Sequence, residues 1–219
     1  TKPNKVKVLE YLDELDPLCE KMGASNTVVK TPEGKLVGYN TDGIGFIRSM
    51  ERDGNVKIDE NIYFCIGSGG AGRAMCSALA YYGAKKISTT DVFEESSKAL
   101  VEDINKNFAP VAEFCPAGDF SKVKEATVVL NASGIGMGSH IGENPLPKEF
   151  ISKDQFYFDA CYNPAKTQFL LDAEEAGATI LNGLGMSLYQ GAAQIEYWTG
   201  QEPPIEAMRQ KLLDIISEK

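Results

Sequence analysis

The stretch Asn61-Ile62-Tyr63-Phe64-Cys65-Ile66-Gly67-Ser68-Gly69-Gly70-Ala71-Gly72-Arg73-Ala74 decides how the rest of the chain is read. An apolar, strand-like run ends at Gly67, and an Ala-rich helical pattern follows Gly72. In a GxGxxG turn between a strand and a helix, the first glycine permits the tight turn, the second lets backbone approach a pyrophosphate, and the third lets the helix pack close to the strand. We therefore expect dinucleotide binding here, with a merely structural turn as the alternative. The expected contacts come from Gly67, Ser68, Gly69, Gly70 and Ala71.

Strand and helix patterns alternate along the chain after this turn. Helical patterns cover 73–82, 94–108 and 167–176, and strand patterns cover 86–90, 112–114, 127–131, 156–160 and 179–181. Alternation with nearly continuous apolar strands indicates an α/β fold whose parallel sheet is covered on both faces. The sequence therefore predicts a Rossmann-type doubly wound sheet, with a glycine-rich mobile loop at 134–144.

The two ends of the chain are expected to form a smaller, discontinuous α/β substrate domain. The front segment predicts a helix over 6–22, a hairpin of 26–30 with 36–39, and a helix over 43–52; the final segment predicts helices over 188–199 and 205–217. Residues 1–43 with 185–219 would make this domain, and 44–184 the dinucleotide-binding domain. We expect the site in the cleft between them.

Composition narrows the function classes. The chain has 219 residues with a net charge of −9, and no basic patch stands out, which disfavours nucleic acid as a partner. No apolar run approaches the length of a membrane span, so no membrane partner is expected. Five cysteines without a CxxC pair favour reduced thiols and a cytoplasmic protein. The spacing of His, Cys and carboxylates implies no metal.

The cofactor choice depends on the end of the second strand of the sheet. In dinucleotide folds an acid there binds the adenosine ribose, whereas a cation pairs with a 2′-phosphate. Here Asp91 follows the strand at 86–90, and the next charged residues are Glu94 and Glu95. These carboxylates favour NAD over NADP. The alternative is that Asp91 only caps the helix that follows.

Several separated motifs resemble the shikimate and quinate/shikimate dehydrogenase family over nearly the whole chain. They are Thr1-x-Pro3-x-Lys5, Gly23-Ala24-Ser25-Asn26-Thr27, Gly38-Tyr39-Asn40-Thr41-Asp42-Gly43, the glycine turn, Asn131-Ala132-Ser133, Tyr162-Asn163-Pro164, and Gly183-Leu184-Gly185-Met186 through Gln190-Gly191-Ala192. The resemblance implies reversible oxidation of a ring hydroxyl of shikimate (to 3-dehydroshikimate) or quinate, with hydride passing to nicotinamide. It also implies a leading strand–helix segment with a Ser-x-Ser motif, which this chain lacks. A homodimer is left open.

The resemblance assigns roles to individual residues. Lys5 and Asp42 match the catalytic pair, and Gly183 joins the cofactor contacts. Where NADP-using members carry Asn-Arg-Thr, this chain has Thr90-Asp91-Val92, which favours the NAD-using branch. The substrate contacts are matched by Thr1, Asn26, Tyr162 and Gln190.

The chemistry of these residues fits the implied reaction. Oxidising an alcohol needs a group that takes the hydroxyl proton, and the single histidine, His140, lies in the glycine-rich loop. Lys5 held by Asp42 is the stronger candidate; a solvated Lys5 and a capping Asp42 are the alternative. Asn26, Thr41 and Gln190 are neutral groups suited to ring hydroxyls, although each is common in turns and caps. Tyr162 could equally be a core aromatic.

Two further expectations complete the sequence reading. Asn131, Ala132 and Ser133 end a strand and are expected to touch the nicotinamide side of the cofactor. The main alternative function is a non-catalytic NAD-binding regulatory module of the same fold, against which the presence of Lys5, Asp42 and Gln190 argues. A dehydrogenase of this architecture acting on an amino acid or a folate-like substrate is a second alternative.

Overall fold

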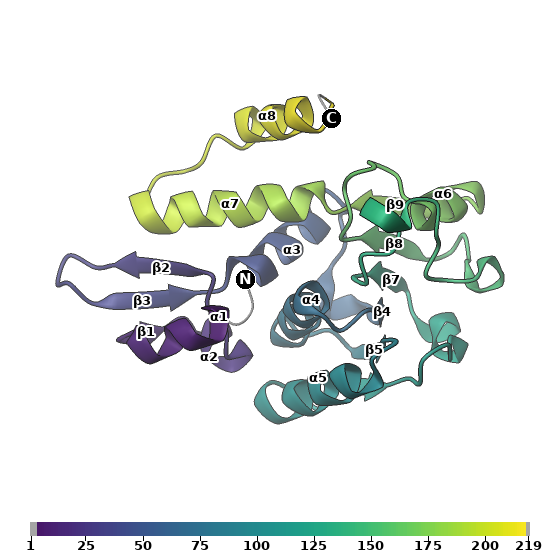
Figure 1. The fold of residues 1–219 in the computed structure, drawn as a ribbon, viewed down its shortest axis with the longest axis horizontal. Helices are drawn as coiled ribbons and strands as arrows, with labels where there is room; N and C mark the ends of the chain where they lie inside the picture. Colours follow the sequence, from purple (N-terminus) through teal and green to yellow (C-terminus); the bar gives the residue numbers. More distant parts are fainter. Residues whose placement is uncertain (1–3, 218–219) are drawn as a thin grey trace.

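The fold is built around a six-stranded sheet in the order β6-β5-β4-β7-β8-β9 (Figure 1). The computed structural model describes residues 4–217. Every neighbouring pair in this sheet is parallel. The chain runs outward from β4 through β5 to β6 and then returns to continue through β7 on the other side, so the predicted doubly wound sheet is confirmed. Its strands are β4 (Ile62–Ile66), β5 (Lys86–Thr90), β6 (Ala112–Phe114), β7 (Val128–Asn131), β8 (Phe156–Asp159) and β9 (Thr179–Asn182).

Helices cover both faces of this sheet. Alternate residues of the central strand enter different cores: Tyr63 and Cys65 pack with α3, α4 and α5, whereas Phe64 and Ile66 pack with α6. No helix within residues 4–217 has both the length and the apolar character needed to cross a bilayer. The helices are α1 (Asn4–Lys7), α2 (Pro17–Met22), α3 (Thr41–Arg52), α4 (Gly70–Tyr81), α5 (Glu94–Asn107), α6 (Gln168–Glu175), α7 (Leu184–Thr199) and α8 (Ile205–Ser217).

A second, three-stranded sheet has the order β1-β3-β2. The strands β2 (Thr27–Lys30) and β3 (Leu36–Tyr39) are antiparallel, which confirms the predicted hairpin, and β1 (Glu14–Leu15) joins β3 in parallel. In Figure 1 this hairpin projects away from the large sheet, beside α7. The fold therefore combines a parallel α/β sheet with a smaller mixed one, as expected.

The single helix predicted over residues 6–22 is wrong. The chain instead forms α1, a 3₁₀ turn (Val8–Tyr11), β1 and α2. Asp16 precedes Pro17, a position that disfavours helical backbone, and its side chain caps α2 by accepting from the backbone N–H of Leu18 at 2.9 Å. The Asp16 backbone N–H donates to the carbonyl of Gly38. Proline chemistry and pairing with β3 therefore override the helical spacing of the leucines.

Helices α3 and α7 cross in close contact and connect the two sheets. A Cβ on Gly45 of α3 would lie 2.5 Å from the carbonyl oxygen of Met186, so only glycine permits this approach. One turn further on, Arg48 binds both carboxylate oxygens of Glu196 at 2.9 and 2.7 Å. Arg209 of α8 donates to Asp53, which follows α3. The final helices are therefore bound to α3, the helix that carries Asp42 in its first turn.

Candidate functional site

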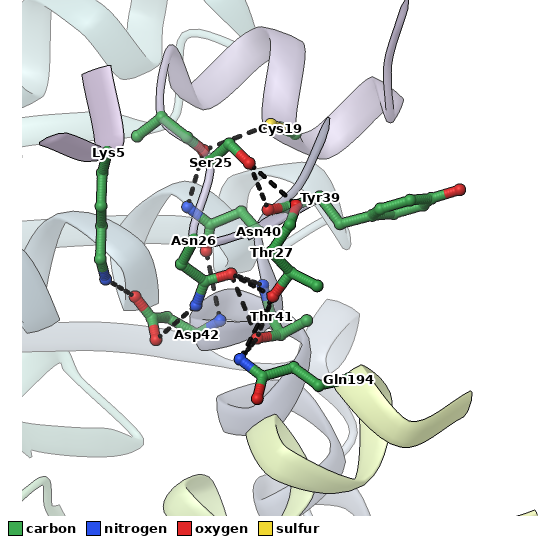
Figure 2. A network of polar contacts seen from close by, with 11 residues as sticks. Lys5, Cys19, Ser25, Asn26, Thr27, Tyr39, Asn40, Thr41, Asp42 and Gln194 are labelled. Atoms are coloured by element: carbon green, nitrogen blue, oxygen red, sulfur yellow. Dashed lines mark hydrogen bonds and ion pairs between the residues drawn. The ribbon is translucent and has the colours of Figure 1, made fainter. Parts of the chain in front are cut away.

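The centre of the candidate site is an ion pair between the Lys5 ammonium and the Asp42 carboxylate (Figure 2). Lys5 lies on α1, and Asp42 lies in the first turn of α3. Their side chains are 32% and 15% exposed, so the pair is partly withdrawn from water. The cap of α3 is Asn40, whose side chain accepts from the Asp42 backbone N–H at 3.2 Å. Asp42 is therefore not the capping residue, and its carboxylate is free to hold Lys5.

A neutral amide fixes the other side of Asp42. Asn26 Nδ2 donates to Asp42 Oδ1 at 3.0 Å, while Lys5 binds Oδ2. Asn26 Oδ1 in turn accepts from the Thr41 backbone N–H at 2.9 Å. These contacts orient the Asn26 amide and leave the carboxylate with a defined direction toward Lys5. A charged ammonium group beside a fixed hydrogen-bonding amide suits recognition of a hydroxyl group.

Gln194 of α7 completes this network, and the sequence motifs do not select it. Its Nε2 lies 3.2 Å from Thr27 Oγ1 and 3.4 Å from Thr41 Oγ1 (Figure 2). Thr41 is fully buried, and its hydroxyl also bonds Asn26 Oδ1. Thr41 therefore lies behind Asn26 as a support. Gln194 lies four positions after Gln190, so the two share one face of a helix. This spacing is the signal that could have identified Gln194.

The ion pair lines a cavity that also reaches the end of the glycine turn, and the volume of this cavity is about 1370 Å³. Lys5 and Asp42 line it together with Gly70 and Arg73 of α4. Residues far apart in the sequence thus share one space. The cavity therefore joins the Lys5–Asp42 ion pair to the first turn of a helix, whose N–H groups are suited to bind phosphate.

The glycine turn has the geometry of a pyrophosphate cradle. A Cβ on Gly72 would lie 1.9 Å from the Gly67 carbonyl oxygen, so helix and strand pack too closely for any side chain. Gly69 and Gly70, in contrast, are exposed, and a Cβ on either would meet nothing within 4 Å. The first N–H groups of α4 have no partner within the helix, and they emerge beside this open surface. The turn is therefore closed toward the protein and open toward a ligand.

We expect Gly72→Ala to destabilise the protein by about 1–3 kcal/mol, because the added methyl group overlaps the backbone of Gly67. Chemical denaturation measures this change. Gly70→Ala is the matched control, since its methyl group enters open space. It should keep the stability but weaken NAD binding; equal stability of both variants would contradict this account of the turn.

Asp91 reaches back to the glycine turn. Its Oδ2 accepts from the Ser68 backbone N–H at 2.6 Å and from Ser68 Oγ at 2.9 Å, and its Oδ1 accepts from the Phe93 backbone N–H at 2.9 Å. Partial burial raises the pKa of Asp91, but the hydrogen bonds from Ser68 and Phe93 outweigh it and hold the pKa below its usual value. Asp91 thus braces the turn before α5, whose cap is Phe93, and also lies as a carboxylate beside the glycine turn.

The loop after β7 lies against the glycine turn. A Cβ on Gly67 would lie 2.6 Å from the backbone nitrogen of Ser133, and Gly67 has a φ of +101°. Asn131 is fully buried, whereas Ser133 is exposed. Gly183 permits a similar approach at β8, since a Cβ there would lie 2.1 Å from the Ala160 carbonyl oxygen. The structure therefore brings Gly67, Ala132 and Ser133 together.

The remaining candidates lie around this centre. Tyr162 follows β8 and is half-buried, and Gln190 lies on α7 where that helix crosses Gly45. Within residues 4–217, neither side chain forms a hydrogen bond with Lys5 or Asp42. Thr1 lies outside the described residues. His140 is exposed and contacts Glu143 in its own loop, away from the ion pair.

Comparison with known proteins identifies the family of the chain. The domain family described as the shikimate 5′-dehydrogenase C-terminal domain matches residues 183–213. A shikimate dehydrogenase (NADP(+)) from Bacillus cereus is 39% identical over 219 residues, which cover 98% of this chain and 76% of that protein.

Two solved structures share the fold. Shikimate 5-dehydrogenase from Listeria monocytogenes, in complex with shikimate and NAD, superposes with a TM-score of 0.91 at 36% identity over 97% of this chain and 75% of its own. Quinate dehydrogenase from Corynebacterium glutamicum, in complex with NAD, gives a TM-score of 0.90 at 32% identity over 98% of this chain and 76% of its own. With this identity sustained over nearly its whole length, the chain belongs to the shikimate dehydrogenase family.

Proposed function

We propose that the protein oxidises a ring hydroxyl of shikimate, of quinate or of both, reversibly and with NAD. The observation that carries the proposal is the cavity that the Lys5–Asp42 pair shares with Gly70, at the end of the glycine turn. Similarity to the Bacillus and Listeria shikimate dehydrogenases and to the Corynebacterium quinate dehydrogenase supports this substrate class. The cavity would lie between the proposed substrate domain (1–43 with 185–219) and dinucleotide domain (44–184).

Lys5 and Asp42 are proposed to handle the proton of the substrate hydroxyl. In oxidation the neutral amine of Lys5 would take this proton from the ring oxygen and become the ammonium that Asp42 holds, and in reduction the ammonium would return it. Asp42 holds the nitrogen in one direction, because one of its oxygens binds Lys5 and the other is fixed by Asn26. Asn26 would bind a neighbouring ring hydroxyl, with Gln190 and Tyr162 as further substrate contacts.

The glycine turn fits a nicotinamide dinucleotide, which supplies the hydride acceptor when bound. The open surface at Gly69 and Gly70 would receive the pyrophosphate, with Ser68 and Ala71 beside it. The loop of Ala132 and Ser133, in contact with Gly67, is proposed to face the nicotinamide. Gly183 would allow α7 to start close to Ala160, just after β8.

We propose NAD as the preferred dinucleotide on the basis of Asp91. Its carboxylate lies beside Ser68 and stays ionised, because hydrogen bonds hold its pKa below the usual value. A carboxylate accepts hydrogen bonds from ribose hydroxyls and repels a 2′-phosphate. The Bacillus cereus relatives are named as NADP(+) enzymes, whereas the Listeria and Corynebacterium structures contain NAD. The proposal of NAD therefore rests on Asp91 at the strand end.

A spectrophotometric assay tests the proposed function. Purified protein mixed with NAD and either shikimate or quinate should form NADH, and 3-dehydroshikimate with NADH should run the reaction in reverse. Calorimetric titration with NAD alone forms the control, because it reports the dinucleotide site without the chemistry. Binding of NAD without turnover of either ring acid would favour the non-catalytic alternative, and absence of both would remove the proposal.

A further inference from the structure

A buried carboxylate, Asp159, lies at the carboxyl end of β8 and is not among the residues that the sequence motifs select. It is 0% exposed, and in the strand register it stands opposite Asn131 at the end of β7. Its hydrogen-bond partners are all neutral donors. Burying a carboxylate costs free energy unless its oxygens accept hydrogen bonds, so the donors that it binds show what holds it there.

Asp159 connects three segments around the carboxyl end of the sheet. Its Oδ1 accepts from Asn131 Nδ2 at 3.1 Å and from the Cys161 backbone N–H at 2.9 Å, and its Oδ2 accepts from the Thr167 hydroxyl. Cys161 directly precedes Tyr162, and Thr167 caps α6. Thr167 also touches the loop after β7, because a Cβ on Gly136 would lie 2.8 Å from Thr167 Cβ. One side chain thus holds the surroundings of both Ser133 and Tyr162.

The amide of Asn131 is fully used inside the protein. Its Nδ2 donates to the Ile135 carbonyl at 2.9 Å and to Asp159, and its Oδ1 accepts from Ser133 N at 3.1 Å and Ser133 Oγ at 2.6 Å. An amide has two N–H donors and one oxygen with two lone pairs, so all four are occupied. Asn131 therefore acts on a ligand through the shape of the loop at Ser133 and Ile135.

The orientation of this amide is fixed from both sides. Asp159 Oδ1 and the Ile135 carbonyl accept from its NH₂ group, and the Ser133 backbone N–H donates to its oxygen. An amide at position 159 could instead turn its NH₂ group toward Asn131 and the Cys161 N–H, where donors would face donors. Burial raises the pKa of Asp159 above its usual value, although the bonds from Thr167, Cys161 and Asn131 oppose that rise.

We propose that Asp159 is a positioning residue that, together with the Ile135 carbonyl and the Ser133 N–H, fixes the Asn131 amide and thereby holds the loop after β7 and the segment bearing Tyr162 in register at the active site. This inference rests on the proposed function, because those two segments are the ones assigned to cofactor and substrate. Asp159 touches neither ligand itself. Its effect should appear in the ordering of the loop and in turnover.

The variants Asp159→Asn and Thr167→Val separate this role from a contribution to stability. Asp159→Asn keeps the shape but removes the acceptor-only character, so kcat should fall about 10- to 100-fold, as expected when reacting groups shift by about 1 Å. Amide hydrogen exchange in residues 133–137 should become faster. Thr167→Val removes a bond to Asp159 and the cap of α6 but leaves the contact of Asp159 with Asn131. It should lower Tm while kcat stays near that of the unchanged protein.

Two results would overturn the proposal. One is a loss of kcat that follows Tm equally in both variants, with unchanged exchange in 133–137. The other applies if Asp159→Asn fails to fold. In the unchanged protein, NAD should then protect the amides of both 133–137 and 161–163 from hydrogen exchange. Protection of only one of these segments would contradict the shared positioning. Turnover by the unchanged protein tests the proposed function separately, so the two failures are distinguishable.

Discussion

Replacing Lys5 with alanine should lower kcat for the ring acid by about 10²- to 10⁴-fold, the range that positioned acid–base groups contribute. Lys5 is the amine that the cavity brings next to Asp42, and no other described lysine pairs with that carboxylate. Asp42→Asn should have a similar effect, because the isosteric amide keeps the contact region with Asn26 but loses the charge that holds Lys5. Steady-state kinetics in both directions measure these losses.

Binding and control measurements make this prediction specific. NAD affinity measured by calorimetry should change little in either variant, because Lys5 and Asp42 lie on α1 and α3, outside the glycine turn. Lys35→Ala is a matched control: Lys35 also pairs with a carboxylate, that of Glu14, but on the exposed hairpin, where an ion pair contributes little. Near-normal turnover in both Lys5→Ala and Asp42→Asn would rule out the pair as the acid–base group.

Asp91→Asn should reduce the preference for NAD over NADP about 10-fold or more, which corresponds to about 1.4 kcal/mol of lost discrimination. The charge that repels a 2′-phosphate disappears, while the neighbouring Ser68 can still donate to the amide oxygen. Ser68→Ala should shift the ratio in the same direction by less, because it removes one of the three donors that fix the carboxylate. The ratio of kcat/KM for the two dinucleotides is the measurement.

Glu95→Gln provides the control for this prediction. Glu95 also follows the second strand of the sheet, but its side chain is 89% exposed and pairs with Lys98. Its removal should leave the ratio nearly unchanged, since exposed charges are screened by salt. If the unchanged protein uses NADP at least as efficiently as NAD, the interpretation of Asp91 is wrong whatever the variants do.

The large sheet could be predicted from the sequence because local pattern and tertiary position agree there. The apolar run at 62–66, the glycine turn and the alternation that follows all favour parallel strands, and β4 and β5 have the predicted bounds. The single helix predicted over residues 6–22 was wrong because the leucines there have helical spacing. Pro17 and the pairing of β1 with β3 oppose one continuous helix. A two-residue strand owes its existence to a distant partner, which no local pattern records.

The site could be predicted where a motif names a residue type with a clear chemical use. The pairing of Lys5 with Asp42 is of this kind, whereas ribose binding by Asp91 stays a prediction. Gln194 and Asp159 were missed because their importance comes from neighbours 153 and 28 residues away. The sequence does show that Asp159 ends an apolar strand. Its link to Asn131 can be inferred only once β7 and β8 are known to be adjacent.

Because α3 and α7 cross at Gly45, the position of Asp42 near the start of the chain depends on a helix near its end. Asp42 lies one turn before this crossing and Gln190 lies on the other helix, so the two share a single rigid joint. The fastening of Arg48 to Glu196 extends that joint by another turn. A deletion that removed α7 would therefore disturb the position of the proposed acid–base pair, although it would remove neither Lys5 nor Asp42.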